Sequence, residues 1–277
     1  AYEIGVRLVG SEMCIRDSPN DEILKKISKL KDSKKTVGGT IRNENKKTFI
    51  NVLQNINLEL NDGDILVIAQ KVVSKSEGRY VRLDNVEPSK KAVELAKLTE
   101  KDPRLMELIL TESREIVRYR NGVIVVENRQ GVILANAGID QSNIENGDGH
   151  VLLLPENPSK SADQIRRAIA SSLDVEVGVI ITDSMGRAWR LGTTGHAIGS
   201  SGVKTVIDLR GKKKDLFGRE LQTTVIGFAD QIASSAALVM GESNEGKPIA
   251  IVRGIDMPSD SDSVNDLIRS KEEDLFR

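Results

Sequence analysis

The sequence has few of the residues on which several classes of protein depend. It contains one cysteine, Cys14, and two histidines, His150 and His196, among 277 residues. A single cysteine excludes a disulfide framework and a multi-cysteine zinc or iron–sulfur site, and two histidines exclude a histidine-rich metal site. If the protein binds a metal, carboxylates must therefore supply most of the ligands.

Aromatic residues, an excess of charge of one sign and long apolar runs are also lacking. Aromatics make up 3% of the residues, too few for rows of base-stacking platforms. The 40 lysines and arginines are balanced by 41 aspartates and glutamates, so the formal net charge is −1 and no basic field favours nucleic acid. No apolar run approaches the roughly 20 residues that span a bilayer. We therefore expect a cytoplasmic protein with neither a nucleic-acid nor a membrane partner.

The order of predicted strands and helices favours an α+β fold with mixed or antiparallel sheets. The apolar run ILVIAQKVVS after Asp62-Gly63-Asp64 is typical of a buried strand, and Asp102-Pro103 marks the start of a helix. Asn121-Gly122 between two apolar segments predicts a hairpin with a type I′ turn. Further strands are expected at VILAN and VGVIITD, and further helices over residues 161–173 and 229–240. Because the alternation is irregular, a doubly wound sheet is less favoured.

The two ends of the chain differ from its middle. Residues 1–18 include VGSEMCIRDS, which resembles translated sequencing-adapter sequence, so we expect a non-native leader there. From Ile255 onward, DMPSDSDSVND is typical of a polar linker, and residues 255–277 are expected to be a linker or tail. The main domain is therefore predicted over residues 19–254.

Three acidic points are candidates for a metal site because each follows a predicted strand or helix. Asp140 lies within NAGIDQSN, Asp183-Ser184 closes VGVIIT, and Glu242 follows a predicted helix. The ends of such elements place side chains at an edge where several can converge on a ligand. Carboxylate, hydroxyl and amide oxygens suit Mg²⁺ or Mn²⁺, which commonly bridge phosphates. Two structural alternatives stay open: Asp140 as a turn residue and Asp183 as a helix cap.

A second group of candidates is basic and lies in glycine-rich sequence. GRAWRLGTTGHAIGSSG carries Arg187 and Arg190, and DLRGKKKDLFGRE adds Arg219. Glycines permit close approach of a backbone to an anion, and arginines bind phosphate or carboxylate through two hydrogen bonds. Lys71 and Lys75 lie beside a predicted strand end, where ordinary solvated surface is the alternative. Since the chain has neither a P-loop nor a Rossmann glycine motif, these features alone predict a metal-dependent enzyme acting on a phosphate-bearing, anionic substrate.

Several longer segments resemble a known family. They are GDILVIAQKVVSKSEGR, KDPRLMELILTESREIVR, GVILANAGIDQSN, LLLPENPSKSADQIRRAI, VIITDSMGRAWRLGTTGHAIGSSG, DLRGKKKDLFGRELQTT and ADQIASSAALVMGESNEGKPIAIVRG, and they extend from about residue 60 to 254. In their order along the chain and in their amino-acid sequence they resemble the coenzyme F420-0:L-glutamate ligase family, the GTP-dependent γ-glutamyl ligases of a deazaflavin coenzyme. The resemblance implies a family-specific α+β fold, an intertwined homodimer and two Mg²⁺ or Mn²⁺ sites that hold GTP, with K⁺ as a further candidate cation.

The resemblance also implies roles for individual residues. One metal would be ligated by Asp140 and Asp183, and the second by Ser184 and Glu242. Contacts to the nucleotide would come from a set of side chains and one loop: Gln70, Lys71, Lys75, Asn143 and the loop from Met240 to Lys247, which contains Gly241, Ser243, Asn244, Glu245 and Gly246. Our candidates for clamping the phosphate and carboxylates of the substrate are Arg187, Arg190 and Arg219.

The implied reaction forms an amide and is driven by GTP. The terminal carboxylate of F420-0 would attack the γ-phosphate of GTP to give an acyl phosphate, and the α-amine of L-glutamate would then displace phosphate. Further glutamates would be added through γ-linkages. Metals and basic residues would offset the charge that builds on the transferred phosphoryl group.

The sequence departs from the family pattern at three places. VGGTIRNENKKTFINVL lacks the glycine–proline turn and the acidic pair of the N-terminal GTP contact, here near residues 39–43. Ala188 stands where the family commonly has proline. LIRSKEEDLFR resembles the junction before a nitroreductase-like flavin domain in two-domain relatives, and a disordered tail is the alternative. Two other functions stay open: a related GTP- and metal-dependent amide ligase with another acid acceptor, and a catalytically idle nucleotide-binding subunit.

Overall fold

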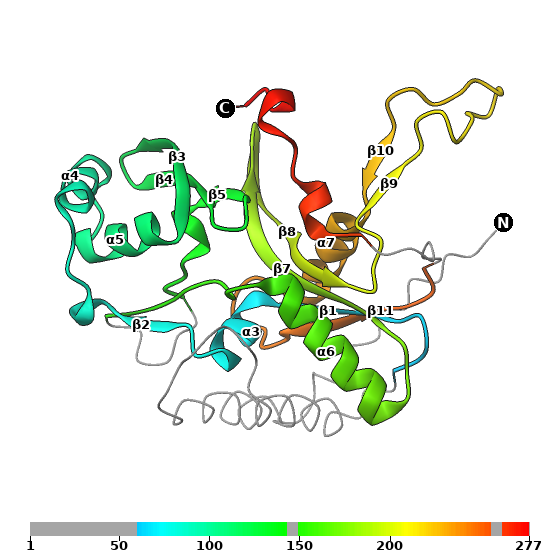
Figure 1. Cartoon of the computed structure of the whole chain (residues 1–277), viewed down its shortest axis with the longest axis horizontal. Helices are drawn as coiled ribbons and strands as arrows, with labels where there is room; N and C mark the ends of the chain where they lie inside the picture. Colours follow the sequence, from blue (N-terminus) through cyan, green and yellow to red (C-terminus); the bar gives the residue numbers. More distant parts are fainter. Residues whose placement is uncertain (1–59, 143–148, 256–261, 277) are drawn as a thin grey trace.

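The computed structural model describes residues 60–142, 149–255 and 262–276. The predicted leader, the N-terminal stretch near residues 39–43 and Asn143 lie outside the described residues. Within them, helices alternate irregularly with strands that form several small sheets, which confirms the predicted α+β class (Figure 1).

A four-stranded mixed sheet in the order β11-β1-β7-β8 forms the centre of the molecule, which we call the body. Its strands are β1 (Ile65–Ala69), β7 (Gly178–Arg187), β8 (Arg190–Ser201) and β11 (Ile249–Val252). β1 pairs parallel with β7 and antiparallel with β11, and β7 and β8 form an antiparallel hairpin. The sheet is covered by α3 (Gln70–Ser76), α6 (Pro158–Leu173) and α7 (Phe228–Met240).

Alternation along β1 explains why both faces of this sheet are covered. Leu66 and Ile68 pack in a core cluster with the apolar residues of α3 and α6, whereas Ile65 and Val67 pack with those of α7. These four side chains are fully buried. A strand buried on both faces is expected to be a continuous apolar run, which is what the sequence shows.

A smaller unit, which we call the lobe (residues 83–140), lies beside the body (Figure 1). It is built of η2 (Leu83–Asn85), α4 (Lys90–Thr99), α5 (Pro103–Thr111), β3 (Ser113–Arg120), β4 (Val123–Asn128), β5 (Ile133–Ala135) and η3 (Asn136–Gly138). The two helices pack on the three-stranded sheet through fully buried side chains such as Met106, Ile109 and Ile124. A short antiparallel pair, β2 (Tyr80–Arg82) and β6 (His150–Leu152), connects the lobe to the body.

Two further features complete the described fold. β9 (Val206–Asp208) and β10 (Val225–Gly227) pair at the base of an arm, residues 209–224, that projects from the body (Figure 1). The chain then ends with η4 (Val264–Leu267) and η5 (Lys271–Glu273). Although its polar composition is typical of a linker, the η4 segment packs on the body, where Val264 is buried and the Thr205 hydroxyl donates to the Ser263 carbonyl at 2.9 Å. None of the described helices is long and apolar enough to cross a membrane.

Several predicted elements are confirmed with corrected bounds. The helix predicted over 161–173 begins at Pro158, because the Asn157 side chain caps it by accepting from the Lys160 amide at 3.0 Å. The strand predicted over ILVIAQKVVS is confirmed in its first half only, since β1 ends at Ala69 and the next residues form α3. A short apolar run does not distinguish a buried strand from a buried helix turn. The hairpin at Asn121-Gly122 is confirmed, but only Gly122 has positive φ, so the turn is not type I′.

The glycine-rich stretch after Asp183 is a strand rather than a loop. β7 continues four residues beyond Asp183, and β8 contains most of the glycines. Two of these allow helices to approach closely: a Cβ on Gly195 would lie 2.6 Å from the Ala233 carbonyl oxygen of α7, and one on Gly199 would lie 2.4 Å from the Pro158 backbone of α6. These glycines therefore serve packing, not the binding of an anion.

Candidate functional site

The lobe and the body meet at an ion pair between Lys71 and Asp140. Lys71, in the first turn of α3, places its Nζ 2.6 Å from Asp140 Oδ2 and donates to the Ser142 hydroxyl at 2.9 Å. The other oxygen of Asp140 accepts from the Ser142 amide and hydroxyl, both at 2.7 Å. Paired backbone hydrogen bonds to Leu152 in β6 hold the Asp140 backbone in place. Asp140 is therefore a turn residue whose carboxylate is also fixed at the junction of the two units.

The charge on Asp140 is favoured by these partners. Burial by itself raises the pKa of Asp140, but the hydrogen bonds from Lys71 and Ser142 and the lysine charge hold it below its ordinary value. The side chain is therefore an ionised carboxylate at neutral pH. Its position at the end of the lobe makes it available to a ligand that the body also contacts.

Asp183 lies in β7 on the sheet face that carries α3 and α6. Ile181 and Met185, two residues before and after it, pack in the core cluster on that face, so alternation directs Asp183 the same way. Burial raises the pKa of Asp183 to about 7, and the nearby charges of Asp140 and Glu242 also raise it. The Ser184 amide and the Lys71 charge act in the opposite sense without cancelling the effect. A carboxyl group in this position would gain from a cation placed among the carboxylates.

Ser184 and Glu242 complete the group that we call the acidic cluster (Asp140, Asp183, Ser184 and Glu242). Ser184 points to the α7 face, opposite Gly195, and its hydroxyl donates to Glu242 Oε2 at 2.5 Å. Glu242 comes directly after α7, so three separate elements supply the cluster. The sequence-based idea that Asp183 caps a helix is wrong, because the residue lies within a strand.

The donor set fits a hard cation that also binds a ligand. Within the described ranges, no three histidine, cysteine, aspartate or glutamate side chains are grouped so that they could hold a metal unaided. Mg²⁺ commonly keeps several waters and takes one or two protein carboxylates together with substrate phosphates. Asp140 and Asp183 supply two carboxylates on one side, and Ser184 and Glu242 supply a hydroxyl and a carboxylate on the other. This set of oxygen donors is compatible with that mode of binding.

Residues predicted to contact a nucleotide lie on either side of this cluster. Gln70 is buried at the start of α3, where its Oε1 accepts from the Ser74 hydroxyl at 2.9 Å, and Lys75 lies in the last turn of the same helix. Met240, the last residue of α7, is buried in the core and does not face the loop that follows. The structure therefore brings Lys71 into the acidic cluster, whereas Gln70 and Met240 are packed.

The loop after α7 folds around one of its own carboxylates. Gly241 has φ +75°, and a Cβ there would lie 2.3 Å from Glu245 Cδ. The Ser243 amide donates to Glu245 Oε2 at 2.8 Å, and bonds from the backbone amides of Glu245 and Ser243 lower the pKa of Glu245. The backbone of this loop thus binds an anionic group, as expected of a phosphate-binding turn. The remaining loop residues are Asn244, Gly246 and Lys247, of which Asn244 is exposed.

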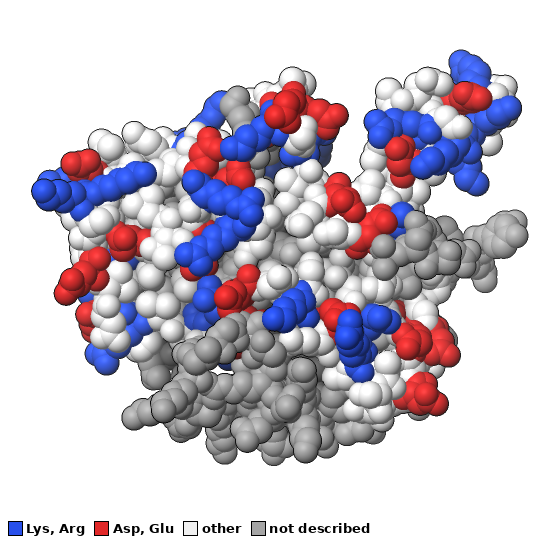
Figure 2. Space-filling model, viewed as in Figure 1, with Lys and Arg blue, Asp and Glu red and all other residues white. Residues whose placement is uncertain are grey.

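The structure does not place the three arginines predicted to bind the substrate, Arg187, Arg190 and Arg219, against the acidic cluster. Arg187 and Arg190 flank the exposed turn of the β7–β8 hairpin, and Arg187 donates to the Leu191 carbonyl at 3.3 Å. Arg219 lies on the arm, where it pairs with Asp215 at 2.7 Å. Figure 2 shows lysine and arginine side chains gathered on that arm, away from the sheet. Across the described parts of the chain, no hydrogen bond or ion pair links these arginines to the cluster.

Sequence reasoning missed a strained turn just before Asp140. Asn136 and Ala137 have φ of 53° and 55°, a conformation that costs a residue with a side chain about 1–2 kcal/mol. The Asn136 Oδ1 atom is also buried without a hydrogen-bond partner. Strain of this kind is found at ligand-binding positions, where surrounding structure holds it in place. The sequence Asn-Ala-Gly could have indicated this turn, because asparagine and glycine tolerate positive φ.

Comparison with known proteins identifies the family. Residues 40–254 match the family model described as F420-0:Gamma-glutamyl ligase. Proteins named coenzyme F420:L-glutamate ligase from Methanocaldococcus jannaschii and Methanococcus maripaludis are 48% and 49% identical over 218 residues, which is 79% of this chain and 86% of each relative. One of the same name from Archaeoglobus fulgidus is 44% identical over 216 residues, 78% of this chain and 85% of that protein. The chain is thus an enzyme of the ligase class. It belongs to the F420-0:gamma-glutamyl ligase family, as the sequence segments predicted.

Proposed function

We propose that this protein joins L-glutamate to coenzyme F420-0 in a GTP-dependent reaction that passes through an acyl phosphate. The observation that carries the proposal is the acidic cluster, to which the lobe, β7 and the loop after α7 each contribute. Relatives that are nearly half identical are named coenzyme F420:L-glutamate ligase, and the family model matches residues 40–254, the range that contains the whole cluster. The lysine-bearing helix α3 and the anion-binding loop lie beside it, where a nucleoside triphosphate would need positive charge and amide donors.

In this proposal the cluster holds two divalent cations, Mg²⁺ or Mn²⁺. Asp140 and Asp183 would ligate one, and Ser184 and Glu242 the other; K⁺ stays a candidate for an additional site. When bound, the cations would offset the charge that develops on the transferred phosphoryl group. Lys71 and Lys75 of α3 would contact the phosphates, together with the amides of the Gly241–Lys247 loop and Asn143.

The residues of the chain would then position the acid and the amine. The terminal carboxylate of F420-0 attacks the γ-phosphate and GDP leaves; the α-amine of L-glutamate then attacks the acyl carbon, and phosphate leaves as the amide forms. Arg187, Arg190 and Arg219 are proposed to bind the phosphate and carboxylates of these substrates. A homodimer and a cytoplasmic location remain predictions.

Mass spectrometry tests the proposed reaction directly. The protein is incubated with F420-0, L-glutamate, GTP and Mn²⁺, and parallel samples contain EDTA or ATP in place of the cation or GTP. Glutamylated F420 that forms only with both GTP and the cation is the expected result, and its longest form gives the number of glutamates added.

Two outcomes would contradict the proposal and point elsewhere. GTP hydrolysis without glutamylated product would favour an amide ligase with another acid acceptor. Binding of GTP by folded protein with neither hydrolysis nor product would favour the idle nucleotide-binding subunit.

A further inference from the structure

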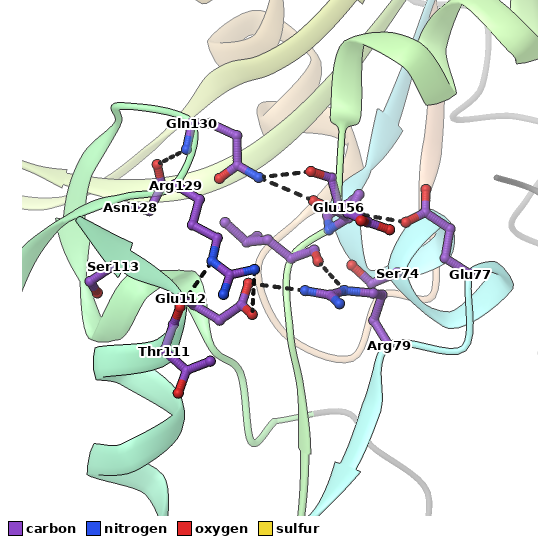
Figure 3. Close-up of polar contacts among 12 residues, drawn as sticks. Ser74, Glu77, Arg79, Thr111, Glu112, Ser113, Asn128, Arg129, Gln130 and Glu156 are labelled. Atoms are coloured by element: carbon purple, nitrogen blue, oxygen red, sulfur yellow. Dashed lines mark hydrogen bonds and ion pairs between the residues drawn. The ribbon is translucent and has the colours of Figure 1, made fainter. Parts of the chain in front are cut away.

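A network of charged and amide side chains joins the lobe to the body away from the acidic cluster (Figure 3). Its centre is Glu112, which ends α5 and is only 13% exposed. Arg79, between α3 and β2, donates through Nη2 to Glu112 Oε2 at 3.0 Å and through Nε to the Leu154 carbonyl at 2.8 Å. One guanidinium therefore binds both the end of a lobe helix and the segment after β6 that returns to the body.

The lobe contributes a second set of bonds through the turn after β4. Arg129 donates from Nε to the Thr111 carbonyl at 2.9 Å and places Nη1 3.8 Å from Glu112 Oε1. Gln130 donates to the Glu156 carbonyl at 3.1 Å, just before α6 begins. The turn after β4 is thus hydrogen-bonded both to the last residue of α5 and to the segment just before α6.

Glu77 extends the network to both body helices that cover this face of the sheet. It follows α3, and its carboxylate accepts from the Ser161 hydroxyl of α6 at 2.5 Å and from the Glu156 amide at 3.1 Å. We call the five side chains Glu77, Arg79, Glu112, Arg129 and Gln130 the lobe clamp. Because α3 carries Lys71, the clamp connects the helix on one side of the acidic cluster with the unit that carries Asp140.

The lobe is also attached to the body by an apolar contact. Leu134 of β5 and Leu154 pack in the core cluster beneath α6. Apolar contacts are not directional, so they resist separation of the lobe better than its rotation. The clamp supplies directional hydrogen bonds at a separate point, and these oppose rotation of the lobe about the apolar contact.

We propose that the lobe clamp, through the Arg79–Glu112 pair, is a positioning device that holds Asp140 where it can share a divalent cation with Asp183. The inference rests on the metal site of the proposed function. Among the described residues, the two carboxylates come from units that are joined by the core contact, the Lys71 pair, β2–β6, the ion pairs of Lys271 with the lobe sheet, and the clamp. The clamp contributes directional bonds that help to fix their separation. Groups that orient metal ligands from outside the ligand shell typically change metal affinity by about 10–100-fold when they are replaced.

Replacing Glu112 by glutamine tests the inference. The variant keeps the shape of the side chain but removes the charge that Arg79 and Arg129 bind. Binding of Mn²⁺ is measured in the presence of GTP by the loss of the electron paramagnetic resonance signal of free Mn²⁺, and folding is checked by circular dichroism. We expect Mn²⁺ affinity to fall by about tenfold or more. Glu176→Gln is the matched control, because Glu176 pairs with Arg166 at 2.9 Å entirely within the body; its Mn²⁺ affinity should equal that of the unmodified protein.

The outcomes separate the clamp from the function on which it rests. If Glu112→Gln folds and binds Mn²⁺ as tightly as the unmodified protein, the clamp has no positioning role. An equal loss in Glu176→Gln would show a general effect of removing an ion pair and would also overturn it. Failure of the unmodified protein to bind Mn²⁺ with GTP would instead contradict the metal site. If Glu112→Gln does not fold, Gln130→Ala, which removes only the amide bonds to residues 155 and 156, should still weaken Mn²⁺ binding severalfold.

Discussion

Asp183 is the residue whose surroundings depart furthest from those of an ordinary surface carboxylate. It is half-buried in the sheet near two other acidic side chains, and its pKa is raised to about 7. A structural role would favour a partner of opposite charge directly against it, as Asp140 has in Lys71. The cost of keeping three carboxylates close together is understandable if a cation binds among them.

Replacing Asp183 by asparagine should therefore separate function from stability. A neutral amide removes the repulsion from Asp140 and Glu242 and fits the same space, so the variant should remain folded. We expect ligation to fall by at least about 100-fold, because an amide is a poor ligand for a divalent cation. The rate of glutamylation by mass spectrometry and the urea midpoint are the two measurements.

Asp163→Asn is the comparison, since Asp163 pairs with Arg167 on exposed α6. Its ligation rate should equal that of the unmodified protein. Full activity in Asp183→Asn would remove Asp183 from the metal site.

At the scale of single elements, the β7–β8 hairpin depends on glycines that let helices lie against it. Alanine at Gly199 would place a methyl group 2.4 Å from the backbone of Pro158, the first residue of α6. Backbone cannot move as a flexible side chain can, so either α6 shifts or β8 bends. We expect Gly199→Ala to lower the free energy of unfolding by about 2–3 kcal/mol, measured by urea denaturation.

Gly186→Ala provides the control within the same hairpin. No atom lies within 4 Å of a Cβ at Gly186, and its φ is not positive. Its stability should stay within about 0.5 kcal/mol of the unmodified protein. Equal stability of the two variants would show that the close approach of α6 is not what requires glycine at residue 199.

The elements that the sequence predicted well are those with local signals. Asp102 and Pro103 start α5 as expected, with the Asp102 side chain accepting from the Arg104 amide at 2.8 Å, and Asn121-Gly122 marks a real hairpin. The sequence did not predict the strand in the glycine-rich stretch, because glycine favours loops when only local preference is considered. Its place in β8 is imposed by helices whose approach no local pattern reveals.

The candidate site was predictable as a set of residues but not as a geometry. The ends of predicted elements indicated Asp140, Asp183 and Glu242, and the family resemblance assigned them to metals. Neither source shows that Lys71 pairs with Asp140, because the two residues are brought together by the packing of the whole lobe on α3. The separation of the arginines from the cluster was equally hidden, since it depends on how far the hairpin and the arm project.

At the scale of the whole molecule, one ion pair joins the start of β1 to the end of its neighbouring strand β11. Asp64 before β1 is 1% exposed, and Arg253 after β11 binds both of its oxygens at 2.7 Å. Removing the charge of Asp64 leaves the guanidinium without its bidentate partner, although Arg253 is 30% exposed and can be hydrated in part. We expect Asp64→Asn to lower the free energy of unfolding by about 2 kcal/mol, below the roughly 3–5 kcal/mol for a fully buried pair.

The measurement is urea denaturation followed by circular dichroism. Asp62→Asn serves as the control at a neighbouring exposed position, where the carboxylate accepts a hydrogen bond from the Glu176 amide at 2.8 Å. A loss no larger than that of the control would show that the pair contributes little to the sheet.

The insertion of the lobe between β1 and β7 has a consequence for the order of folding. These parallel neighbours are separated in the chain by the entire lobe and by α6, so their pairing closes a very long loop. The lobe contains a hairpin and two sequential helices, whose contacts are short in sequence and form quickly. Collapse of the lobe would shorten the loop before β1 and β7 meet. The strand that carries Asp183 should thus be added late, so the acidic cluster would assemble only after the unit bearing Asp140 already exists.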